Sequence, residues 1–130
     1  MDLLPRLPEL LHHVLGVEAT PQGARPRLWT AGQRARFLTD NVWRSRSDCC
    51  AGSAIAFITD AAAVTLTLAI GGRLRPWLGL DVEVDGRIVD GRRWSEHRDA
   101  VVAERFSLGP AGVLRRVRLW LPLSAEVFVA

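Results

Sequence analysis

Two acidic residues of the central part of the chain could do chemistry. Asp81 and Glu83 alternate with Leu80, Val82 and Val84, and such alternation predicts a strand with one dry face and one wet face. The two carboxylates would share the wet face, where they could bind a glycoside or a cation. Solubilising the strand is the simpler interpretation of the same pattern.

Tryptophan and arginine meet in a second stretch. Trp120 falls in phase with Arg116 and Arg118, opposite an apolar row. If that row faces the core, the indole of Trp120 should meet a partner domain or a ligand. Trp94, in a charged stretch, is a second candidate of the same kind, and for both indoles packing in a core or an interface is the competing interpretation.

A catalytic centre is not expected. Ser53 lacks the flanking glycines of a hydrolase nucleophile elbow. His97 has Ser95, Glu96 and Asp99 beside it, but neighbours in sequence seldom converge into a triad. We therefore predict no catalytic residue in this chain.

Neither a metal nor a cofactor is predicted. Cys49 and Cys50 are adjacent, which disfavours a disulfide, and they lack metal-ligand spacing. His12 and His13 would point about 100° apart on a helix and could not chelate one ion well. The glycine motifs that bind phosphates are missing too.

Composition excludes several classes of protein. The 130 residues are 48% hydrophobic, as in an ordered globule, and carry a net charge of +3. All 17 basic residues are arginine, but most lie near acids, so we expect no nucleic-acid partner. The apolar runs are too short to span a membrane, so no membrane partner is expected either. The start of the chain lacks the basic region of a signal peptide, which favours the cytoplasm.

The N-terminal third predicts short elements. A helix is expected over Leu7–Leu15 and a strand over Val17–Thr20, followed by a loop over Pro21–Pro26. Thr30 is a candidate cap for a helical turn over residues 31–37. The stretch 40–50 has no clear period and is predicted to be a polar connector, anchored by its tryptophan.

From residue 53 onward the period is that of strands. Strands are expected over residues 53–59, 64–70, 80–84, 100–108, 113–121 and 125–129, with a return strand that begins at residue 87. Asp85-Gly86 predicts a tight hairpin turn, Asp90-Gly91 another turn, and 92–99 a charged loop. The fold class is therefore all-β, an antiparallel β-sandwich of jelly-roll type with a short N-terminal helix. We divide the chain into a helical segment, 1–16, and a sandwich domain, 17–130.

Three segments resemble a known family. Phe57–Ala61 and the strand after it resemble an "F-x-T-D-S" element. Gly79–Gly86 resembles a "G-x-D-L-Y … V-D-G" hairpin, and Leu119–Val127 is similar to a "Y-L-P-H-L-A-E-V" ending. These elements belong to the β-sandwich domain that precedes the catalytic domain in two-domain SGNH (GDSL-like) hydrolases and carbohydrate esterases. The early segment Pro26–Gln33 fits its "P-R-L-T-x-x-Q" stretch.

The resemblance implies a function that the residues alone do not give. The family's catalytic serine and Asp-x-x-His blocks belong to the following domain, so none of its catalytic residues maps onto this chain. The chain is expected to be a non-catalytic accessory domain that packs on an SGNH catalytic domain in cis and shapes a site for an ester or an acetylated carbohydrate. Glu83, Leu123 and Ser124 depart from the family pattern. A stand-alone carbohydrate-binding module is the alternative.

Overall fold

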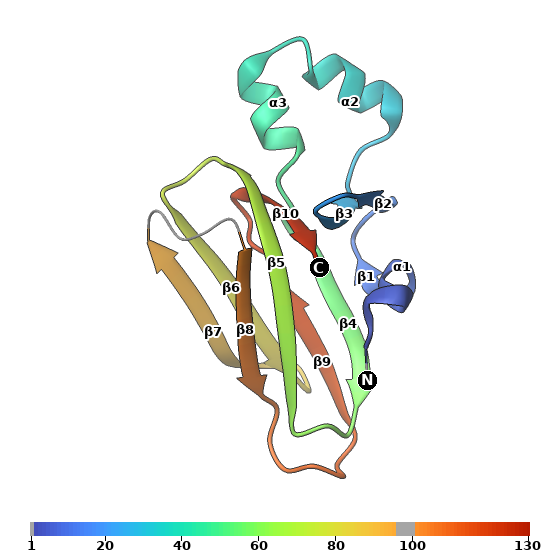
Figure 1. The fold of residues 1–130 in the computed structure, drawn as a ribbon, viewed down its shortest axis with the longest axis vertical. Helices are drawn as coiled ribbons and strands as arrows, with labels where there is room; N and C mark the ends of the chain where they lie inside the picture. The colour runs from blue at the N-terminus through green and yellow to red at the C-terminus, as the bar shows by residue number, and fades with distance from the viewer. Residues whose placement is uncertain (1, 96–100) are drawn as a thin grey trace.

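The computed structural model describes residues 2–95 and 101–130 and contains two five-stranded antiparallel sheets (Figure 1). We name each sheet after one of its inner strands. The β9 sheet has the order β1-β4-β9-β6-β7, and the β5 sheet has the order β2-β3-β10-β5-β8. The strands of the β9 sheet are Leu11–His12 (β1), Ala54–Thr59 (β4), Arg115–Trp120 (β9), Trp77–Val84 (β6) and Arg87–Ser95 (β7). Those of the β5 sheet are Gly16–Thr20 (β2), Gly23–Arg27 (β3), Ala125–Val129 (β10), Ala63–Arg73 (β5) and Val101–Ser107 (β8).

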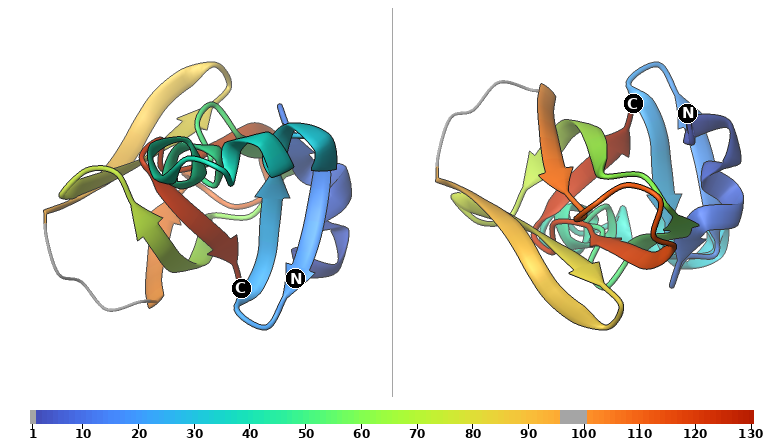
Figure 2. Two further views of the ribbon diagram at one scale, coloured as in Figure 1. Left: turned by 90° about the horizontal axis from the view of Figure 1, so that it is seen from above. Right: turned by 90° about the horizontal axis from the view of Figure 1, so that it is seen from below.

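The strand order is that of a jelly roll, which confirms the predicted fold class. The chain can be followed as one long hairpin, whose successive strand pairs are β3/β10, β4/β9, β5/β8 and β6/β7. Successive pairs lie in opposite sheets, so the hairpin is rolled into a sandwich. The end views show the two layers of this roll (Figure 2).

The tip of the long hairpin is the turn between β6 and β7. Asp85 has φ 50° and Gly86 has φ 83°, which is the left-handed conformation that a two-residue hairpin turn requires at both positions. The Asp85 carboxylate accepts a hydrogen bond of 2.9 Å from the backbone N–H of Arg116. The predicted turn is therefore confirmed, and it is tied to the neighbouring strand β9.

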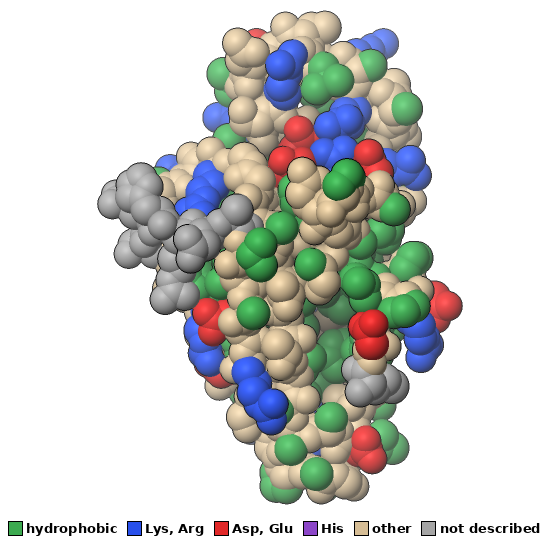
Figure 3. Space-filling view, viewed as in Figure 1, with side chains coloured by type: hydrophobic (Ala, Val, Ile, Leu, Met, Phe, Trp, Pro, Cys, Tyr) green, Lys and Arg blue, Asp and Glu red, His purple; other side chains and the backbone are tan. Residues whose placement is uncertain are grey.

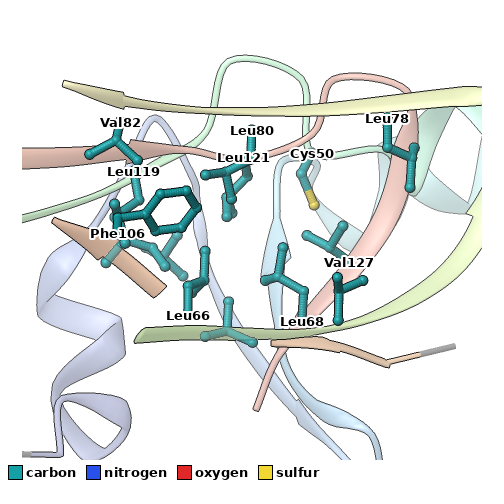
Figure 4. Packing of buried hydrophobic residues seen from close by; sticks show 14 of the residues in the cluster. Cys50, Leu66, Leu68, Leu78, Leu80, Val82, Phe106, Leu119, Leu121 and Val127 are labelled. Carbon is teal, nitrogen blue, oxygen red and sulfur yellow. The ribbon is translucent and has the colours of Figure 1, made fainter. Parts of the chain in front are cut away.

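The core lies between the two sheets (Figure 4). Leu78, Leu80 and Val82 of β6 point from one layer toward Leu66 and Leu68 of β5 in the other. All five are at most 6% exposed. This is the dry face that the alternation of the sequence predicts, and its burial is the main force that holds the sheets together.

The N-terminal segment belongs to the same core. A 3-10 turn, Leu4–Arg6, precedes α1, Leu7–Leu10, which confirms a short helix but ends it five residues earlier than predicted. Leu11 and His12 instead form β1, which pairs with β4. Leu7, Leu10 and Leu11 are buried in the sandwich core, so the apolar stripe is shared between a helix and a strand.

Two predicted breaks are strands. Pro21–Pro26 was expected to be a loop, but only its first residues turn, because β3 runs through Pro26, which lies opposite Val17. Asp90-Gly91 was expected to be a turn, but both residues lie inside β7. A side chain at residue 91 would come within 2.9 Å of Asp81 Oδ1, so this glycine permits close packing and does not reverse the chain.

Two helices are inserted between β3 and β4. The predicted helical turn is confirmed as α2, Ala31–Phe37, with a capping box between Thr30 and Gln33. The predicted connector is wrong, because Asn41–Ser47 form α3, with the Asp40 carboxylate as its N-cap. The insert lies at one end of the sandwich (Figure 1). Asp48 pairs with Arg34 of α2 at 3.0 Å, and its ion pair with Arg25, at 3.7 Å, ties the insert to β3.

Candidate functional site

The side of the β9 sheet that faces away from the core carries five of the six candidate residues. We call it the outer face. Asp81 and Glu83 come from β6, and Arg116, Arg118 and Trp120 come from β9. The register places Asp81 opposite Trp120 and Glu83 opposite Arg118. Antiparallel pairing therefore brings together two motifs that lie more than thirty residues apart in the sequence.

Glu83 is the hub of a polar cluster on this face. One carboxylate oxygen accepts a hydrogen bond of 2.8 Å from Arg118 Nη1, and the other accepts one of 3.0 Å from Trp120 Nε1. The Glu83 side chain is 13% exposed, so this ion pair is better shielded than most surface pairs. The cluster fixes the orientation of the Trp120 indole and leaves its ring half-buried.

Trp120 forms one wall of a hollow of about 250 Å³. Trp77 and Leu123, which are 51% and 60% exposed, form the rim. Gly52, Gly79 and Leu121 line it as well. The His13 ring lies 6.2 Å from the Trp120 ring, centroid to centroid. Aromatic walls around a small open volume suit a flat ring that stacks on indole.

A second ion pair lies at the hollow. Arg93 Nη2 donates a hydrogen bond of 2.6 Å to Asp81 Oδ1, and Arg93 Nη1 donates one of 3.1 Å to the Leu80 carbonyl. A side chain at Gly79 would come within 3.1 Å of the Arg93 side chain. The glycine therefore lets the guanidinium lie across β6, where it can donate to a ligand in the hollow.

Arg116 stands apart from these contacts. It is exposed, and its guanidinium makes no ion pair with a carboxylate of the described residues. With Arg118, Ile58 and Leu114 it lines a shallow depression of about 540 Å³ beside the hairpin turn. Since Ile58 is 64% and Leu114 is 73% exposed, this part of the outer face combines apolar area with a free positive charge.

Trp94 does not lie on the outer face. The predicted charged loop is strand β7 as far as Ser95, and residues 96–99 of that prediction, His97 included, lie outside the described residues. Trp94 is 5% exposed and belongs to the core. Its Nε1 donates a hydrogen bond of 3.2 Å to Glu104 on β8. Trp94 therefore joins the two sheets. The prediction that it binds a ligand or a partner is wrong, and the competing interpretation, packing in the core, holds.

The described residues show no assembled catalytic centre. Ser53 is fully buried, and its Oγ has no hydrogen-bond partner. His13 Nδ1 is engaged by the Gly52 carbonyl at 2.9 Å. Both cysteines are free thiols, and burial raises the pKa of Cys50 to about 12, so it is not a ready nucleophile. Among the residues described, no three His, Cys, Asp or Glu side chains are grouped to hold a metal ion.

Trp77, Gly79 and Arg93 were missed by the sequence reasoning. The sequence could have indicated two of them, because Trp77 and Gly79 continue the wet phase of Asp81 and Glu83 along β6. Arg93 could be found only by counting residues from the hairpin turn. The bulge between Val82 and Glu83 shifts that count.

Comparisons with known proteins find a similar structure but no similar sequence. No protein-family model and no curated protein matches the sequence. Among solved structures, the fold is similar to the salicylyl-acyltransferase SsfX3 from a tetracycline biosynthetic pathway, with a TM-score of 0.73 and 19% identity. The match covers 92% of this chain but only 34% of the acyltransferase. The similarity shows a shared β-sandwich fold, and the chain spans about a third of that larger enzyme.

Proposed function

We propose that this chain is the non-catalytic β-sandwich domain of a cytoplasmic SGNH-type esterase or acyltransferase, and that its outer face packs on the catalytic domain. The observation that carries the proposal is the outer face itself. Trp77, Leu123 and Ile58 are each more than half exposed there, beside indole and guanidinium groups that neighbouring residues hold in place. Aromatic and arginine anchors within exposed apolar area are typical of interfaces.

Two further observations support this proposal. A domain of this fold forms about a third of a larger acyltransferase. An esterase passes its acyl group to water and an acyltransferase passes it to another acceptor, so the two enzymes share one chemistry. The described residues also lack a paired nucleophile and base. In the proposed enzyme Trp120 and Asp81 would line the acyl-ester or acetylated-sugar site, and the catalytic groups would come from the partner domain.

An esterase assay tests the accessory role. The chain as it stands is expected to hydrolyse p-nitrophenyl acetate no faster than buffer. Turnover that is lost in Ser53→Ala or His97→Ala would overturn the proposal. The reading frame that follows codon 130 is expected to encode a Gly-Asp-Ser block, and a stop codon there would contradict a partner in cis.

The hollow favours a second candidate function, a stand-alone carbohydrate-binding module. Trp77 and Trp120 flank a ring-sized volume, and the Asp81–Arg93 pair offers an acceptor and a donor for sugar hydroxyls. Titration with oligosaccharides should then shift the tryptophan fluorescence. The shift should be lost in Trp77→Ala and retained in Trp43→Ala, whose indole lies in α3. An unchanged spectrum with every sugar would remove this candidate.

A further inference from the structure

The helical insert exposes apolar side chains that the sandwich does not use. In α3, Val42 and Trp43 are 58% and 53% exposed, and Leu38, after α2, is 37% exposed. Leu74, in the loop between β5 and β6, is 39% exposed. Within the described residues, none of these four side chains belongs to the core cluster. Packing in the sandwich core therefore does not explain why they are apolar.

An aromatic stack holds Trp43 in its exposed position. Its ring stacks on Phe37, with centroids 5.9 Å apart, and Phe37 in turn meets Trp29 edge-on at 5.1 Å. The Arg46 guanidinium lies 5.7 Å from the centre of the Trp43 ring. The indole is thus preorganised by α2 and α3 and is not a mobile side chain of a loop.

The same surface is positively charged. Arg36, Arg44, Arg46 and Arg75 are exposed, and none of them pairs with a carboxylate of the described residues. The insert's own acids are already engaged, because Asp40 caps α3 and Asp48 binds Arg34. Basic and hydrophobic side chains intermingle over this end of the molecule (Figure 3). An anionic partner would therefore meet little electrostatic repulsion here.

A groove of about 650 Å³ runs between α3 and the β5–β6 loop, and it shows how these groups are arranged. Val42 and Leu74 supply its apolar part, and Arg46 and Arg75 supply its cationic part. An amphiphile with an anionic head and a hydrocarbon tail would satisfy both parts. A soluble anion would leave the apolar residues exposed to water.

We propose that this end of the molecule binds an anionic lipid surface. The insert surface comprises Leu38, Val42, Trp43, Leu74 and the four arginines named above. Phosphate head groups would bind the guanidinium groups of Arg46 and Arg75, and Val42, Leu74 and the Trp43 indole would enter the boundary with the acyl chains. Exposed indole and aliphatic side chains beside guanidinium groups are suited to lying in such an interface.

The position of the insert suits docking on a planar lipid surface. It projects from one end of the sandwich (Figure 1), so a planar surface can reach it without touching the sheets. Within the part of the chain that the structure describes, no helix is long and apolar enough to cross a bilayer. The proposal concerns attachment to the surface and revises the expectation that a membrane plays no part. It does not depend on the proposed acyl-transfer role.

Co-sedimentation with vesicles tests the proposal. The chain should bind phosphatidylcholine vesicles that contain phosphatidylglycerol and should bind pure phosphatidylcholine at least about tenfold more weakly, since several arginines act together. Raising the NaCl concentration should release it. Equal binding to both vesicles, or binding to neither, would overturn the proposal.

Charge reversal locates the surface. Arg46→Glu with Arg75→Glu should weaken binding by more than about tenfold. The matched control is Arg87→Glu with Arg105→Glu, two exposed arginines on β7 and β8, which changes the net charge equally. Equal losses in both double variants would show general attraction and reject the site. Trp43→Ala should reduce binding at temperatures below its own unfolding transition, which the loss of stacking on Phe37 lowers. Release by millimolar inorganic phosphate at constant ionic strength would indicate a soluble anion and contradict a lipid surface.

Discussion

The same three residue types form two clusters with different purposes. On the outer face, Glu83 accepts hydrogen bonds from Trp120 Nε1 and from Arg118. At the edge between the sheets, Glu104 accepts them from Trp94 Nε1 and, at 3.2 Å, from Arg92 Nε. The two carboxylates are similarly shielded, at 13% and 21% exposure of the side chain.

The clusters differ in what the indole faces. Trp94 is 5% exposed and packs in the core, and the Arg92 guanidinium lies 4.8 Å from the Phe106 ring centre. This cluster, which we call the latch, connects β7 of one sheet to β8 of the other. Trp120 is half-buried and opens on the hollow. A Trp-Glu-Arg cluster therefore does not by itself indicate a binding site, and the phase of the tryptophan on its strand decides whether it supports the fold or presents a ring.

The largest expected difference between the two clusters is in stability. Trp94→Ala should lower the free energy of unfolding by about 3–5 kcal/mol, since it empties a core position and unties the latch. Trp120→Ala should cost about 1 kcal/mol, because its ring already meets solvent. Urea unfolding measures both. Equal losses would show that the outer face is as important to the fold as the latch.

The two glutamates should follow the same order with smaller effects. Glu104→Ala leaves the Trp94 N–H buried without its acceptor, which should cost about 1–3 kcal/mol. Glu83→Ala leaves the N–H of a half-buried indole, which water can reach, so the loss should stay under about 1 kcal/mol. The second variant should instead broaden the Trp120 side-chain resonances in NMR, as the ring loses its fixed orientation. A sharp, unshifted Trp120 signal would contradict the role of Glu83.

Much of the fold could be predicted, because alternation reports burial directly. Leu80 and Val82 on β6, and Val117 and Leu119 on β9, are all at most 1% exposed, as their phase predicts. That phase also placed Trp120 on the outer face. The sequence pattern worked on these two strands, where apolar and polar residues alternate without interruption.

The failures have physical reasons as well. Helix α3 was missed because an exposed helix has no apolar stripe, and its only signal was the cap at Asp40. Trp94 was assigned to a loop because Arg92 and Arg93 directly precede it, yet Arg92 donates a hydrogen bond to Glu104 at the sheet edge. Gly91 resembled a turn residue although it serves close packing. The hollow also depends on pairing across strands, which a single sequence does not display.

Two glycines of the outer face test how tightly the hollow is built. Gly91→Ala would place a methyl group 2.9 Å from Asp81 Oδ1 and 3.1 Å from the Leu80 carbonyl, a backbone atom that cannot move away. It should cost about 1–2 kcal/mol in urea unfolding. Gly79→Ala meets only the flexible Arg93 side chain, so stability should change by less than about 0.5 kcal/mol.

Gly72→Ala is the matched control, since no atom lies within 4 Å of its new methyl group. It should be neutral or slightly stabilising, because alanine restricts the unfolded chain. A larger loss in Gly79→Ala than in Gly91→Ala would mean that the Arg93–Asp81 pair, and not the backbone packing, holds this part of the face.

The smallest expected effect on stability is at an ion pair that, unlike the two clusters, includes no tryptophan. Glu18 on β2 accepts a hydrogen bond of 2.6 Å from Arg25 Nη2, and this bond lowers the pKa of Glu18 below its usual 4.5. A lowered pKa in the folded state means that the pair stabilises the fold above pH 4.5 and that this contribution is lost as the pH falls through the folded value. The Glu18 side chain is 47% exposed, so solvent weakens the pair.

Glu18→Gln should therefore change thermal stability little at pH 7 and less still at pH 3. A Glu18→Gln variant that is more destabilised at pH 3 than at pH 7 would show that the neutral carboxyl, and not its charge, is what β2 requires.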